Sequence, residues 1–160
     1  MLEFERYRSE AEIEDVVRRF ESCDYKPEEF VHARHLTVAA WYFLHLDTVA
    51  AENRMRTGLQ KFIQHHGKNG YHVTITEFWL RLVNKTLHEM GPEGGFVSRL
   101  NQVVEVLNNK DLIYQYYSRE QLEMPGAKAA RMEPDLKRIP KAERWRVQKE
   151  DSSSSRQARR

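Results

Sequence analysis

Apolar residues spaced three and four positions apart, grouped between helix start signals, constrain this chain most strongly toward helices. Ser9 and Glu12 form a capping-box pattern, and Thr74 and Glu77 form a second one. Asp47 is a third start signal, because an aspartate at this position can accept a hydrogen bond from a helix N-terminus. No segment alternates with a period of two for long enough to compete as a β-strand.

The spacing predicts an all-α protein, an up-and-down bundle of four to five helices joined by short loops. A chain of 160 residues is long enough to bury one core. The predicted helices span about residues 10–22, 28–46, 49–66, 74–90 and 96–108, and a short sixth helix covers about 112–117.

The character of the chain changes after Pro125. Residues 126–160 carry a net charge of +6, whereas residues 1–125 carry −4. Apolar residues also thin out there, and prolines interrupt any helix. We therefore predict a bundle domain over 1–125, an extended strap packed on the bundle over 126–140, and a basic, disordered tail over 141–160.

Composition excludes several classes of protein. No apolar run approaches the roughly 18–20 residues of a membrane helix, and no signal peptide is expected, so the cytoplasm is the predicted location and no membrane partner is predicted. Cys23 is the only cysteine, which rules out an internal disulfide and a thiolate metal cluster. Nucleic-acid binding is disfavoured because the bundle is acidic and Trp145 is the only aromatic residue in the basic tail. The oligomeric state is left open.

Histidines are the chemically distinctive residues of the predicted bundle. His32 and His35 lie one turn apart on one face of the predicted helix 28–46. Because the next helix returns antiparallel, the loop after it should lie beside the start of helix 28–46 and bring His72 to the same end. His65 and His66 fall near that loop as well, although both suit a helix C-terminus, where a cation is favoured.

This convergence predicts a divalent metal site with His32, His35 and His72 as ligands for zinc or iron. Glu29, one turn before His32, and Glu77 would serve as a further ligand, as a partner of a ligand, or as the catalytic base. The favoured function is a metal-dependent enzyme acting on a small-molecule substrate. The alternative is a metal-free interaction or sensory module whose histidines are structural, each bonded to a neighbouring group.

Four segments of the chain resemble a family of small, uncharacterised bacterial all-helical proteins, and the similarity covers about residues 30–140. The family motifs are F-x-H-x-x-H-L, present at residues 30–36, and Y-H-x-T-I-T, present at 71–76. Further similar segments are 117–122 and 133–136. The resemblance supports the three histidines as a set and implies no particular activity. Val73 stands where related sequences often carry Glu.

Overall fold

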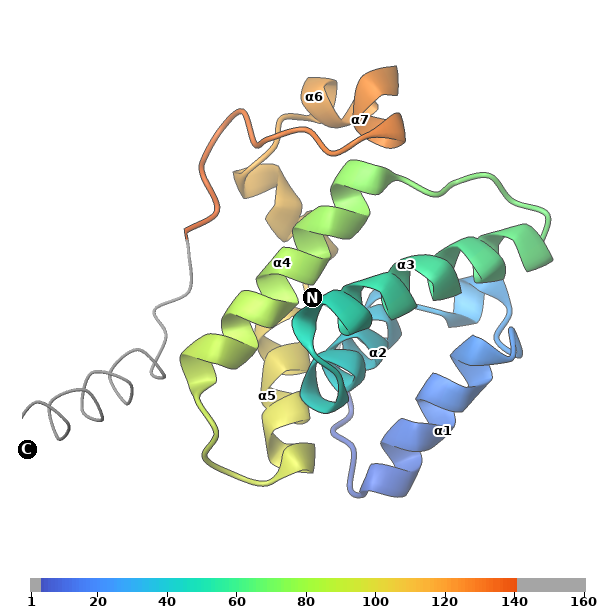
Figure 1. The fold of residues 1–160 in the computed structure, drawn as a ribbon, viewed down its shortest axis with the longest axis vertical. Helices are drawn as coiled ribbons and strands as arrows, with labels where there is room; N and C mark the ends of the chain where they lie inside the picture. The colour runs from blue at the N-terminus through green and yellow to red at the C-terminus, as the bar shows by residue number, and fades with distance from the viewer. Residues whose placement is uncertain (1–3, 141–160) are drawn as a thin grey trace, which may run out of the picture.

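A computed structural model describes residues 4–140, and in this part of the chain the secondary structure is helical, without β-strands (Figure 1). The all-α prediction is therefore confirmed for these residues. The predicted tail, 141–160, lies outside the described residues, as do residues 1–3. The helices are α1 (Glu10–Glu21), α2 (His32–His45), α3 (Thr48–His65), α4 (Val73–Met90), α5 (Phe96–Leu107), α6 (Arg119–Glu123) and α7 (Pro125–Ala129), with 3₁₀ turns η1 (Pro27–Glu29) and η2 (Lys110–Gln115).

Helix α2 is the central element of the fold. It packs against α1, α3, α4 and α5 (Figure 1). Five consecutive residues, 36–40, are buried, so the helix is enclosed on every side over more than one turn. Small residues such as Ala39 and Ala40 are among those buried on this helix.

The start of α1 follows the sequence pattern. The Ser9 hydroxyl accepts the Glu12 amide at 3.3 Å, and the Glu12 carboxylate accepts the Ser9 amide at 3.2 Å. The predicted capping box is thus confirmed. The Asp47 cap of α3 is confirmed as well, since its carboxylate accepts the Ala50 amide at 2.9 Å.

Helix α2 begins four residues later than the sequence predicted. Residues 27–29 form the separate 3₁₀ turn η1, and Phe30 and Val31 leave the helical region with ψ values of 68° and 169°. The Phe30 ring is buried and stacks on Phe20 with 4.8 Å between ring centroids. Burying this ring turns the chain between η1 and α2. Glu29 therefore does not share a helix with His32, and the prediction that it did is wrong.

The start of α4 also differs from the prediction. His72, not Thr74, caps the helix, because its Nδ1 accepts the Ile75 amide at 3.2 Å. Thr74 lies within the first turn and is fully buried. The predicted capping box of Thr74 and Glu77 is therefore wrong.

Residues 110–140 contain the short elements η2, α6 and α7 and the segment that follows them. Residues 110–115 form the 3₁₀ turn η2, and residues 125–129 are helical, although the sequence predicted an extended segment from residue 126. Helix α7 packs against α4. Further along, the Tyr117 hydroxyl donates to the Met132 carbonyl at 2.7 Å, and the Leu136 amide donates to the Tyr116 carbonyl at 2.9 Å.

We expect Gly58→Ala to lower the free energy of unfolding by about 1–3 kcal/mol. A Cβ at Gly58 in α3 would lie 2.7 Å from Cε2 of Phe20, whose ring is fully buried and packs against the rings of Phe30 and Phe62. This clash outweighs the gain of about 1 kcal/mol in helix propensity. Urea unfolding measures the change. Gly126→Ala is the control, because a Cβ at Gly126 meets nothing within 4 Å. A Gly58→Ala protein as stable as this control would contradict the expectation.

Candidate functional site

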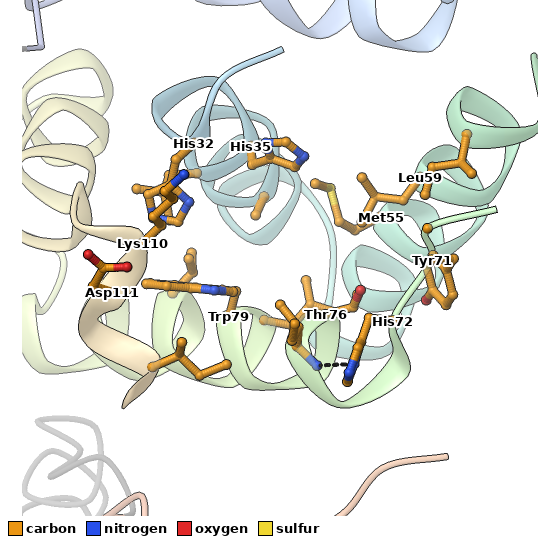
Figure 2. A pocket seen from close by; sticks show the side chains of 18 of the residues that line it. His32, His35, Met55, Leu59, Tyr71, His72, Thr76, Trp79, Lys110 and Asp111 are labelled. Atoms are coloured by element: carbon orange, nitrogen blue, oxygen red, sulfur yellow. Dashed lines mark hydrogen bonds between the residues drawn. The ribbon is translucent and has the colours of Figure 1, made fainter. Parts of the chain in front are cut away.

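A cavity of about 510 Å³ lies between α2, α3, α4 and η2 (Figure 2). Its volume falls within the range of small-molecule binding sites, roughly 300–1,000 Å³. The wall residues are mostly apolar: Leu36, Ala39, Met55, Leu59, Ile63, Ile75, Trp79, Leu80, Val83 and Ile113. The polar lining comes from His32, His35, Tyr71, His72, Thr76, Lys110, Asp111 and Tyr114. The loop after α3 and the start of α2 thus border one space, as the topology predicted.

His35 contributes a neutral imidazole to the cavity. Its Nδ1–H donates to the Val31 carbonyl at 3.2 Å, and its ring packs on Phe30 with centroids 4.0 Å apart. The pKa of His35 is lowered to about 4, mainly by burial; the Val31 carbonyl opposes this shift and the neighbouring His32 adds to it. At neutral pH the Nε2 atom of His35 therefore carries a lone pair.

His32 is held in a similar way at the other end of the same wall. Its Nε2–H donates to the Leu107 carbonyl at 3.1 Å, which ties α2 to the end of α5. The ring meets Trp79 edge-on at a centroid distance of 4.4 Å. Burial lowers the pKa of His32, and the Lys110 ammonium adds to this effect, against the opposing Leu107 carbonyl. Both α2 histidines thus favour the neutral form.

His72 lies across the cavity from His32, with its ring turned toward the α4 backbone (Figure 2). Its Nε2–H donates to the Leu122 carbonyl at 2.8 Å, while Nδ1 accepts the Ile75 amide. Both nitrogens are therefore engaged. Within residues 4–140, no three His, Cys, Asp or Glu side chains are grouped so that they could hold a metal ion. A zinc or iron site at His32, His35 and His72 stays a prediction, and forming it would break at least one of the two His72 hydrogen bonds.

The two predicted catalytic carboxylates lie outside the cavity lining. Glu29 accepts the Lys26 amide at 2.8 Å and closes the 3₁₀ turn η1. Glu77 accepts two hydrogen bonds from Arg56, at 2.6 and 2.7 Å, and so joins α4 to α3. Both contacts are structural, and neither brings a carboxylate to the histidines.

Lys110 and Asp111 line the cavity and were not singled out by the sequence pattern. They open η2, where the Asn109 side chain accepts the Asp111 amide at 3.1 Å. Asparagine is common in turns because its side chain can accept the backbone amide two residues later. Asn109 could therefore have indicated a turn directly after α5. His65 and His66, at the end of α3, do not belong to the lining.

No protein-family model, curated protein or solved structure matches this chain. No helix within residues 4–140 combines the length and the apolar character needed to cross a membrane. The cavity and its histidines are therefore the features on which a function can be based.

Proposed function

We propose that this protein is a metal-free binding module that recognises a small, largely apolar molecule in the cavity between α2, α3, α4 and η2. One observation carries the proposal: a cavity of about 510 Å³ has mostly apolar walls and a few convergent polar groups, including two neutral imidazoles. Such a combination is the usual composition of a small-molecule site.

The apolar walls would supply most of the binding free energy, because each square ångström of apolar ligand surface removed from water contributes roughly 25 cal/mol. The imidazoles would orient the ligand. Hydrogen bonds to the Val31 and Leu107 carbonyls hold His35 and His32 in place, so little side-chain freedom is lost when a ligand binds.

Binding is favoured over catalysis by the state of the ionisable groups. The Glu29 and Glu77 carboxylates are engaged elsewhere, and a histidine with a pKa of about 4 is a weak base at neutral pH. This supports a binding or sensory role for the protein, with histidines that position a ligand.

We expect Ala39→Leu to weaken the binding of 2-naphthol, an aromatic probe of suitable size, by about tenfold or more. Ala39 lines the cavity one turn after His35, so the larger side chain occupies the space of the ligand. Isothermal titration calorimetry at pH 7 measures the affinity. Ala50→Leu in α3 makes the same chemical change outside the lining and should leave binding unchanged. Equal affinities for both variants, or no binding to the unmodified protein, would contradict the proposal.

Metal analysis distinguishes this proposal from a metal-dependent enzyme. We expect protein purified without an affinity tag to bind zinc or iron far below one equivalent, because both nitrogens of His72 are engaged. Elemental analysis after incubation with each metal and dialysis provides the measurement. Near-stoichiometric metal that is lost in both His32→Ala and His72→Ala would overturn the metal-free proposal and support the predicted metal site.

A further inference from the structure

The hydrogen bond of His35 determines what its cavity-facing edge can recognise. Because Nδ1–H donates to the Val31 carbonyl, Nε2 is the acceptor nitrogen of the ring. Within residues 4–140, no other group makes a hydrogen bond to this atom, and it is not among the enclosed polar atoms that lack a partner. Figure 2 shows the ring on the α2 wall with one edge toward Met55. Nε2 thus offers a lone pair to a bound molecule.

The other tautomer of His35 would be costly. Moving the proton to Nε2 would leave the Nδ1 lone pair facing the Val31 carbonyl oxygen at 3.2 Å. Two acceptors at this distance repel each other. The wall therefore presents an acceptor to the ligand, and a ligand that offers only acceptors, such as a carboxylate or an ether, gains no hydrogen bond from it.

The surroundings of this acceptor suit a flat apolar body. Ala39, one turn along α2, leaves space beside the ring, and the Met55 thioether lies opposite on α3. Met sulfur makes favourable contacts with aromatic rings. The Trp79 indole forms a further wall from α4 and can stack on an aromatic ligand.

We propose that the cavity selects a neutral aromatic alcohol, of the phenol or naphthol class, whose hydroxyl donates a hydrogen bond to Nε2 of His35. This inference rests on the proposed function, since it assigns a ligand class to the same cavity. It predicts that, among ligands with the same ring system, the one with a hydroxyl proton binds most tightly.

The test compares three probes of similar shape by calorimetry at pH 7: 2-naphthol, 2-methoxynaphthalene and naphthalene. We expect 2-naphthol to bind about tenfold more tightly than 2-methoxynaphthalene, which corresponds to one hydrogen bond at the strong end of the usual net range. In His35→Phe this ratio should fall to about twofold or less, while naphthalene still binds. Equal binding of the naphthol and its methyl ether to the unmodified protein would overturn the ligand class but leave the cavity as a binding site. Binding of none of the probes would overturn both.

A second measurement needs no substitution at His35. In ¹⁵N-labelled protein, the Nε2 resonance of His35 should shift on addition of 2-naphthol, because a bound proton changes the shielding of an acceptor nitrogen. Addition of 2-methoxynaphthalene should leave it nearly unchanged. Equal shifts with both compounds would overturn the inference even if His35→Phe fails to fold.

Discussion

Thr74→Val is expected to lower the free energy of unfolding by about 2–4 kcal/mol, although valine has nearly the same shape as threonine. The Thr74 side chain is fully buried in the first turn of α4. Its hydroxyl lies 2.6 Å from the Ala127 carbonyl oxygen and 3.0 Å from the Ala130 carbonyl oxygen, and it accepts the Met132 amide at 3.0 Å. Valine would leave these two carbonyl groups and this amide, all in residues 127–132, without their side-chain partner. Each buried polar group left unpaired costs about 1–3 kcal/mol.

Urea unfolding followed by circular dichroism measures this change. Thr86→Val is the matched control on the same helix, because the Thr86 hydroxyl donates only to the Leu82 carbonyl within α4. We expect this control to cost about 0.5 kcal/mol or less. If both variants unfold at the same urea concentration, the Thr74 hydroxyl does not stabilise the packing of residues 127–132 against α4.

Acidification is expected to destabilise the protein through His35, by up to about 3 kcal/mol between pH 6.5 and pH 4. The pKa of His35 is about 4 in the folded protein, against about 6.5 for a histidine exposed to water. Between these values the unfolded chain binds a proton that the folded protein does not, so stability falls as the pH is lowered. Below pH 4 both states are protonated, and this contribution becomes constant.

His35→Gln isolates this effect from the other titrating groups, since it removes the imidazole and keeps a polar side chain. Unfolding free energies of both proteins, measured at half-unit steps from pH 4 to pH 7.5, provide the comparison. We expect the difference between the two proteins to change with a midpoint inside this interval. A constant difference would show that the His35 ring titrates normally and is not desolvated in the fold.

Local sequence signals predicted most helix boundaries to within one or two residues. The start of α2 differs more, because a tertiary contact determines it. Ser9 and Asp47 were predicted as caps because their partners, the amides of Glu12 and Ala50, lie three residues away. The start of α2 could not be read in this way. It depends on Phe30, which is buried against Phe20 of α1. The apolar spacing within the predicted helix 28–46 gives no sign of this contact.

At the site too, the sequence predicted the approximate position of residues but not their hydrogen-bond partners. The sequence predicted that His72 lies near the start of the helix that carries His32 and His35, and all three residues line one cavity. It could not predict that His72 donates to Leu122, a residue 50 positions away, or that Glu77 pairs with Arg56 of α3. These long-range partners use the groups that a metal or a substrate would have needed.

A crystal structure determined with 2-naphthol, using data that also record the anomalous signal of zinc, tests the central claim most directly. The account predicts electron density for the naphthalene ring between α2 and α4, with its oxygen within hydrogen-bond distance of Nε2 of His35. It also predicts that His72 keeps both of its hydrogen bonds. A cavity without ligand density at saturating naphthol, or a metal peak joining His32, His35 and His72, would contradict it.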